Sequence, residues 1–187
     1  MPLMHARAPR FTLTDYLEWE LSHSEKFEYA GGLILAMAGA QPRHNEVAVN
    51  TTTALSVRLR GRCRVLNSDQ RLCNGDGLHT YADAAVVCGA MQLTTYKGTG
   101  TLHNACLVVE VLSKSTREYD LGEKLESFQT TPSIQDILLI EPDTVDVRHV
   151  RRTEMGWETR RFRSDLDEID LMGITLPLSE IYLDAPG

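Results

Sequence analysis

The chain has 187 residues, of which 42% are hydrophobic and 24% are charged, the balance of an ordinary globular protein with one sizeable core. The net charge of −7 argues against a broadly basic surface that binds nucleic acid tightly and without specificity. No apolar run is long enough to cross a membrane, and the first residues lack the apolar core of a signal peptide, so we expect a cytoplasmic protein with no membrane partner.

The first sixty residues predict two helices with a hairpin between them. Thr12 is expected to cap a short amphipathic helix that continues to about residue 21. Residues 26–39 are typical of a hairpin that turns at a Gly-Gly pair. A second helix is expected from about residue 43 to residue 60, with Gly61 as a suitable C-terminal stop.

Strands dominate the rest of the chain, with one helix among them. Residues 90–104 are rich in glycine and threonine and are expected to form a loop. The helix is expected to begin near Ser115 or Asp120 and to end at Phe128. The layout is mixed α/β, and a single central sheet with helices packed on it is the simplest architecture. The expected strands cover residues 63–73 (as one or two strands), 79–89, 105–112, 134–142, 144–152 and 157–162, and a short helix covers residues 178–182.

Three of the strand-like segments each carry one carboxylate beside apolar side chains. Glu110 lies within an apolar run, Asp83 directly precedes another, and Glu28 lies between two aromatic residues. A buried carboxylate is costly unless a cation or a metal ion compensates its charge. Each acid alone has an ordinary explanation, such as a place at the end of a strand or an ion pair with a neighbouring lysine or arginine. Together the three acids also suit a Mg²⁺ site, which needs one or two carboxylates and several water molecules.

The four cysteines are Cys63, Cys73, Cys88 and Cys106. They are widely spaced and include no CxxC pair, which argues against a structural zinc site and against a secreted disulfide framework. Cys88 and Cys106 lie in or beside apolar runs, so we expect both to be small buried hydrophobic side chains.

The chain contains, in this order, the segments "FTLTDYLEW", "KFEYAGGLILAMAGAQPRHNEVAVNTTTAL", "YADAAVVCG", "LVVEVLSKSTREYDLGEKLESF" and "ILLIEP". In order and spacing they resemble the Uma2 family, also called DUF820, which is described as a restriction endonuclease family of the PD-(D/E)XK nuclease-like superfamily. The resemblance implies a restriction endonuclease-like fold, with a central mixed β-sheet flanked by helices. It also implies a nuclease domain over residues 11–187, preceded by an N-terminal extension over residues 1–10.

The resemblance further implies a phosphodiesterase site that uses Mg²⁺ or Mn²⁺. Asp83 matches the first metal-binding acid of the family and Glu110 matches the second, while Glu28 matches the acid of the early segment. The chain departs from the usual pattern at two positions. Ala82 replaces the proline before the first acid, and Leu112 occupies the place two residues after the second acid where the superfamily has lysine.

The resemblance assigns the role of that missing lysine to Lys124, in the following helix. An ordinary alternative is an ion pair on the helix surface, because Asp120 lies four residues before Lys124. Asp120, Ser113 and His44 are accessory candidates near the same site. Ser113 also suits a helix N-terminus, and His44 also suits the surface of a helix end.

We therefore expect an endonuclease that hydrolyses DNA, and a two-fold homodimer is expected by analogy with other nucleases. Two alternatives stay open at this point: a nuclease-fold module that binds or assembles without catalysis, and a hydrolase of another phosphate ester. DNA contact would have to use local basic patches. The candidates for contact with the DNA backbone are Arg58, Arg60, Arg62, Arg64, Arg151 and Arg152.

Overall fold

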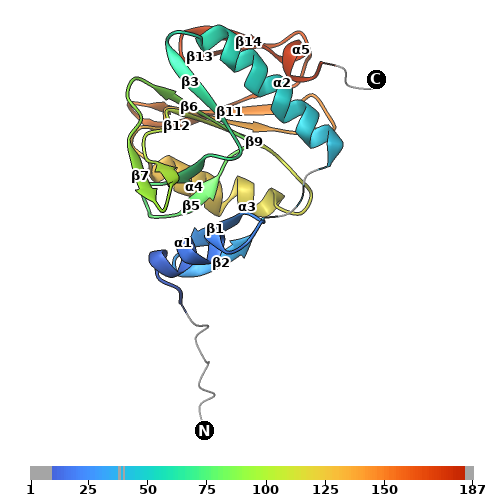
Figure 1. Cartoon of the computed structure of the whole chain (residues 1–187). Coiled ribbons are helices and arrows are strands. Elements are labelled where there is room, and N and C mark those ends of the chain that lie inside the picture. The colour runs from blue at the N-terminus through green and yellow to red at the C-terminus, as the bar shows by residue number, and fades with distance from the viewer. Residues whose placement is uncertain (1–9, 38, 40, 184–187) are drawn as a thin grey trace.

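The computed structural model describes residues 10–37, 39 and 41–183, so the expected N-terminal extension lies outside the described part except for Arg10. The central sheet, called sheet B here, consists of β3 (Cys63–Asn67), β6 (Ala84–Cys88), β9 (Leu107–Val111), β10 (Asp136–Ile140), β11 (Val147–Thr153) and β12 (Gly156–Phe162). The strand order is β12-β11-β10-β9-β6-β3 (Figure 1). β9 and β10 are parallel and the other neighbours are antiparallel. The expected mixed central sheet is therefore confirmed.

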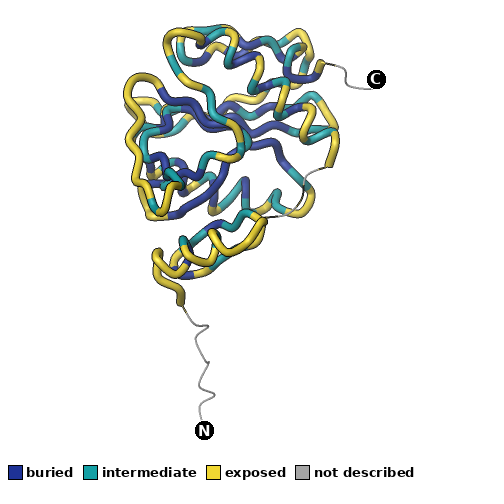
Figure 2. The backbone as a smooth tube through the Cα atoms, viewed as in Figure 1, coloured by how far each residue is buried: buried dark blue, intermediate teal, exposed yellow. Residues whose placement is uncertain are grey.

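Helices cover both faces of sheet B. They are α2 (Pro42–Leu59) on one face, and α3 (Arg117–Leu121) and α4 (Glu123–Thr130) on the other (Figure 1). Because side chains alternate along a strand, β9 supplies both cores. Val109 packs in the core that contains Leu55 of α2, and Val108 packs in the core that contains Phe128 of α4. The central strands β6, β9 and β10 are accordingly the most continuously buried part of the sheet (Figure 2).

A second six-stranded sheet, called sheet A, was not expected. It consists of β1 (Phe27–Ala30), β2 (Leu33–Ala36), β4 (Arg71–Cys73), β5 (His79–Tyr81), β7 (Leu93–Tyr96) and β8 (Thr99–Leu102). The strand order is β2-β1-β5-β4-β8-β7. The expectation of a single sheet was wrong because the segment at 79–89 is not one strand. Its backbone leaves sheet A after β5 and enters sheet B at β6, and Asp83 lies at this crossing.

The expectation of a loop over residues 90–104 was also wrong, because β7 and β8 form a hairpin there. The turn is made by Lys97 and Gly98, whose φ angles are 45° and 91°. Two successive residues with positive φ match the twist of a hairpin, and the threonines beside them favour extended backbone. The glycines that suggested a loop therefore belong to a turn and a strand.

The expected helix over residues 115–128 is present in two parts, α3 and α4, separated at Gly122. A Cβ atom at Gly122 would lie 2.9 Å from the carbonyl oxygen of Glu118, so glycine allows the backbone to bend closely at this point. The bend decides where Lys124 projects, because it redirects the chain just before α4 begins.

The ends of the described chain pack against the two sheets. The first helix, α1 (Leu13–Leu21), has the expected Thr12 cap, and Asp15 completes a capping box with it. Near the C-terminus a two-stranded ribbon, β13 (Glu168–Leu171) and β14 (Ile174–Pro177), precedes α5 (Leu178–Ile181). The ribbon was not expected, and it packs in the core beside α2. Among the helices that the structure describes, none is both long and apolar enough to cross a membrane.

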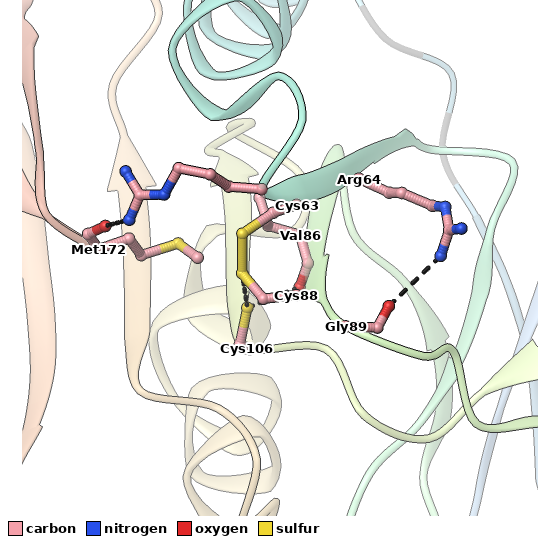
Figure 3. Close-up of a disulfide and its surroundings, with 8 residues drawn as sticks. Cys63, Arg64, Val86, Cys88, Gly89, Cys106 and Met172 are labelled. Atoms are coloured by element: carbon pink, nitrogen blue, oxygen red, sulfur yellow. Dashed lines mark hydrogen bonds between the residues drawn. A yellow bond between two sulfur atoms is a disulfide. The ribbon is translucent and has the colours of Figure 1, made fainter.

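Cys63 and Cys88 form a disulfide between the edge strand β3 and β6, where they are paired in the antiparallel register (Figure 3). The sequence argued only against a secreted disulfide framework and did not predict this single bond. It predicted that Cys88 is a small buried hydrophobic side chain, and this was wrong. Cys88 ends its strand and is exposed. The reason for the error is that the pair is created by strand register, which spacing along the chain does not reveal.

Candidate active site

The pairing of β6 with β9 brings Asp83 and Glu110 together. Ala84 lies opposite Val109 in this antiparallel pair, so the next residues along, Asp83 and Glu110, also face each other. Residues that lie opposite each other project from the same face of a sheet. The backbone N–H of Val111 donates a hydrogen bond of 2.7 Å to Asp83 Oδ2 and fixes that carboxylate at the end of the pair.

A pocket of about 620 Å³ opens at this point, between sheet A, sheet B and the start of α2. The carboxylates that line it outnumber the ammonium groups, so the pocket carries an excess of negative charge. The excess favours a cation in the pocket and opposes an anion that arrives without one. Its charged lining residues are Glu25, Lys26, Glu28, Asp83, Glu110, Asp120 and Lys124.

Lys124 is the buried cation of the site, with 4% of its surface exposed. Its Nζ lies 2.9 Å from Glu110 Oε1 and 3.1 Å from Glu28 Oε1. It donates a hydrogen bond of 2.9 Å to the carbonyl oxygen of Tyr81. The alternative of an ion pair on the helix surface is therefore wrong, since Lys124 projects inward from α4 between two acids.

Glu28 reaches the site from sheet A and is held by two hydroxyl groups. Tyr29 lies opposite His79 in the pairing of β1 with β5, and this register puts Thr80 beside Glu28. Thr80 Oγ1 donates to Glu28 Oε1, and the hydroxyl group of Tyr119 donates to Oε2 at 2.8 Å. The carboxylate of Glu28 is therefore fixed, and it is only 4% exposed.

His44 lies in the first turn of α2, and its imidazole contacts the carboxylate of Asp83. Its Nε2 is 3.4 Å from Asp83 Oδ2, and this contact raises the pKa of the imidazole despite the opposing effect of burial. Its Nδ1 is buried and has no hydrogen-bond partner within the described residues. The residue His44 itself lines the pocket.

The loop after β9 and the start of α3 brace a further acid, Asp120. Thr116 Oγ1 donates to Asp120 Oδ2, and the hydroxyl groups of Thr116 and Ser113 are 2.8 Å apart. Ser113 also accepts a hydrogen bond of 3.2 Å from the backbone N–H of Thr116. The structure thus gives Ser113 a supporting role in the loop, because it holds the threonine that binds Asp120. Asp120 lines the same pocket as Lys124.

Burial and crowding shift the protonation of the central pair. Burial raises the pKa of Glu110, Lys124 offsets part of that effect, and nearby Asp83 adds to the rise. Burial alone would lower the pKa of Lys124, but the surrounding carboxylates outweigh it and the net pKa is raised. Lys124 therefore stays protonated at neutral pH, so it acts as a fixed positive charge and is no proton acceptor.

Asp83 and Glu110 carry the carboxylate oxygens that a divalent ion would bind. Glu110 Oε1 is buried and contacts the Lys124 ammonium group at 2.9 Å, but that ammonium group is shared with Glu28 and with the carbonyl oxygen of Tyr81. Carboxylate oxygens are the donors that Mg²⁺ and Mn²⁺ prefer, and Asp83 and Glu110 provide them on one face. Within the described residues, no group of three or more His, Cys, Asp or Glu side chains is placed to hold a metal ion, so the protein ligands available here are the two carboxylates. The donor set thus fits a divalent ion that keeps several water molecules.

Most of the arginines expected at a DNA backbone are engaged elsewhere in the fold. Arg58 makes two hydrogen bonds to Glu180, at 2.7 and 2.6 Å. Arg151 binds Asp136, and Arg152 binds backbone carbonyl groups and stacks on an aromatic ring. Arg62 and Arg64 each donate to a backbone carbonyl oxygen, whereas Arg60 is exposed and makes no side-chain hydrogen bond in the described part.

Sequence reasoning brought Glu28, Asp83, Glu110, Asp120 and Lys124 into consideration, and the structure places all five in one pocket. It missed the two hydroxyl groups that hold Glu28. Tyr119 precedes Asp120 in a segment already singled out, so its position next to a site acid was a usable signal. Thr80 had no such signal, because its contact depends on the register of sheet A.

Comparison with known proteins identifies the family and the fold. The model of the Uma2 family, described as "Putative restriction endonuclease", matches residues 13–179. Two proteins of Synechocystis sp., named "Uncharacterized protein slr1290" and "Uncharacterized protein sll1609", are 32% identical over 93% of this chain and 92% of the relative, and 29% identical over 85% and 91%. A crystal structure of "a putative nuclease belonging to DUF820" from Anabaena variabilis has the same fold, with a TM-score of 0.72, 18% identity, and coverage of 89% of this chain and 97% of that one. The chain therefore belongs to the Uma2 family.

Proposed function

We propose that this protein is a metal-dependent endonuclease that hydrolyses phosphodiester bonds of DNA, with Mg²⁺ or Mn²⁺ as its cofactor. The observation that carries the proposal is the excess of carboxylates over ammonium groups in the pocket where Asp83 and Glu110 face each other. A negatively charged phosphodiester is repelled by such a pocket unless a cation accompanies it. Family membership supports the same assignment.

The side chains of the pocket divide the work of a hydrolytic site. Asp83 and Glu110 would hold the metal ion, which when bound lowers the pKa of a water molecule and offsets charge on the phosphate. Lys124 keeps Glu110 and Glu28 in place and adds a positive charge beside the phosphate. Glu28, fixed by its two hydroxyl partners, is placed to accept a hydrogen bond from a water molecule in the pocket.

Cleavage of plasmid and linear DNA in Mn²⁺ and Mg²⁺ tests the proposal. Asp83→Asn and Glu110→Gln are expected to lower the rate by about 100-fold or more, since each removes charge on which the transition state depends. Glu126→Gln is the matched control, because Glu126 is an exposed acid on α4 and its loss should leave the rate unchanged. The proposal fails if the wild-type protein leaves DNA intact, or if the two site variants cleave as fast as the control.

Hydrolysis of a smaller phosphate ester is a second candidate. Most of the candidate arginines are bonded within the fold and do not form a continuous basic groove for a duplex. This observation favours the smaller substrate. A small ester needs only the pocket. Comparing rates on a nucleotide ester and on an oligonucleotide, with the same metal and variants, separates this candidate from DNA cleavage.

Calorimetry with Mn²⁺ addresses the remaining alternative, a module that binds without catalysis. Such a module would show no Mn²⁺ binding, or binding that Asp83→Asn leaves unchanged. The cytoplasmic location, the two-fold dimer and the single nuclease domain stay predictions from the sequence.

A further inference from the structure

Three sulfur atoms meet at one end of sheet B, away from the pocket. Cys63 on β3 is bonded to Cys88, the last residue of β6. Cys106, which directly precedes β9, has its Sγ 3.6 Å from the Sγ of Cys88. In the view of Figure 3 the three sulfurs follow one another in a row, with Cys88 in the middle.

The third cysteine is held in this place by the sheet. The backbone N–H of Cys106 donates to the carbonyl oxygen of Val86 at 2.7 Å, and its thiol points to the same oxygen at 3.2 Å. Cys106 is half-buried, and burial raises the pKa of its thiol. Cys88 is an exposed residue at the end of its strand.

Thiol–disulfide exchange requires a sulfur nucleophile in contact with one sulfur of a disulfide. Cys106 is already in contact with Cys88, so no approach through solvent is needed and the effective concentration of the attacking thiol is high. The remaining cysteine, Cys73, lies on β4 of sheet A and takes no part in the row.

We propose that Cys63, Cys88 and Cys106 form a thiol–disulfide exchange site, in which Cys88 pairs with either neighbour and reacts with small thiols and disulfides of the glutathione class. In the internal step the Cys106 thiol loses its proton and its sulfur attacks Cys88 Sγ. A Cys88–Cys106 bond forms, the Cys63–Cys88 bond breaks, and Cys63 leaves as a thiolate that takes up a proton. No external oxidant or reductant is consumed in this step.

The two pairings tie different strands. The Cys63–Cys88 bond joins the edge strand β3 to β6, whereas a Cys88–Cys106 bond joins β6 to the start of β9. In that second pairing β3 has no covalent link to β6 and is held by its hydrogen bonds and by the packing of side chains such as Val65. The site is independent of the proposed nuclease activity, because the three sulfurs do not line the pocket.

The test uses Cys63→Ser treated with oxidised glutathione and followed by intact-protein and peptide mass spectrometry. Glutathione is expected to attach to Cys88 and then to be displaced by Cys106, which releases reduced glutathione and leaves a Cys88–Cys106 disulfide. The glutathionyl group should be lost at least about tenfold faster than from the control Cys63→Ser/Cys106→Ser, where the nucleophile is absent. Cys63→Ser/Cys73→Ser should behave like Cys63→Ser.

The proposal is overturned if Cys63→Ser keeps the glutathionyl group as long as the double variant with Cys106→Ser, or if no Cys88–Cys106 peptide forms. Wild-type protein supplies a second measurement that does not depend on a variant. After treatment with reduced glutathione and trapping by iodoacetamide, peptides containing Cys88–Cys106 are expected beside those containing Cys63–Cys88. Exclusive recovery of the second kind contradicts the exchange.

Discussion

Two neighbouring strands of sheet B, β9 and β10, each bury a carboxylate, and the two carboxylates are held in opposite ways. Leu139 lies opposite Glu110 and shares its face, so Asp136, three residues earlier on β10, projects from the other face. Asp136 Oδ1 is bonded by His149 at 2.6 Å and by Arg151 at 2.8 Å. Burial would raise its pKa, but these bonds prevail and the pKa is lowered.

Glu110 has no comparable compensation. It shares one cation, Lys124, with Glu28, and its pKa is raised well above the ordinary value. A buried carboxylate with enough hydrogen-bond donors and cations, such as Asp136, stabilises the fold. A buried carboxylate with too little positive charge around it, such as Glu110, lowers the stability of the fold when it is ionised. Such a deficit is typical of functional sites. The difference distinguishes a structural acid from a candidate ligand on the same sheet.

Removing the shared cation should have the largest effect on stability. Lys124→Met is expected to lower the free energy of unfolding by about 3–5 kcal/mol, because two buried carboxylates lose their partner. The loss should be smaller at pH 5 than at pH 8, since carboxylates that lack a cation can take up protons. Urea denaturation at both values measures it, with Lys114→Met, an exposed lysine, as the control. A loss below about 1 kcal/mol at pH 8 would show that the acids do not depend on Lys124.

Asp136→Asn should be less costly, by about 1.5–3 kcal/mol, because it weakens two charge-assisted hydrogen bonds. The pKa of Asp136 is lowered in the folded state, so its contribution is present above the ordinary value of 3.8 and is lost as the pH falls through the lower folded value. Wild type and variant should therefore converge in acid. Denaturation between pH 3 and pH 7 checks this, and DNA cleavage should be unchanged. A constant difference across that range would contradict the assignment.

Glu110→Gln should act in the opposite direction and raise the free energy of unfolding by about 1 kcal/mol at pH 8. The pKa of Glu110 is raised, so ionisation of the folded protein costs stability once the pH passes the ordinary value of 4.5, and the cost grows until the folded pKa is reached. The variant should gain on wild type over that window and lose cleavage. Thermal melts at pH 4 and pH 8 measure the gain, and a variant that is less stable at both values contradicts it.

The sequence predicted the acids of the site better than the sheets that hold them. Glu28, Asp83 and Glu110 were recognisable because a charge among apolar residues is unusual at any position. Lys124 was found through family resemblance, while its inward direction depends on the bend at Gly122. The amino-acid sequence around Lys124 does not indicate the direction in which its side chain projects.

The errors arise where distant segments meet. The division of residues 79–89 between two sheets, and the disulfide between Cys63 and Cys88, both depend on strand register. The hairpin over residues 93–102 was missed because glycine and threonine suit a loop as well as a tight turn between strands. Local patterns therefore predicted the long helices and the strands of sheet B, whereas the other strands and all pairing partners needed the structure.

The smallest predicted effects concern two arginines. Arg58 is bonded within the fold, as Asp136 is, whereas Arg60 has no side-chain partner among the described residues. Arg58 is bonded to Glu180, so Arg58→Gln should cost about 0.5–1 kcal/mol of stability and leave DNA binding unchanged. Arg60 is exposed, so Arg60→Gln should leave stability within about 0.5 kcal/mol of wild type. If Arg60 contacts the DNA backbone, its loss should reduce the slope of log affinity against log salt by about 1. Equal salt slopes for Arg60→Gln and wild type would remove Arg60 from the DNA surface, and a reduced slope for Arg58→Gln would show that its ion pair opens on binding.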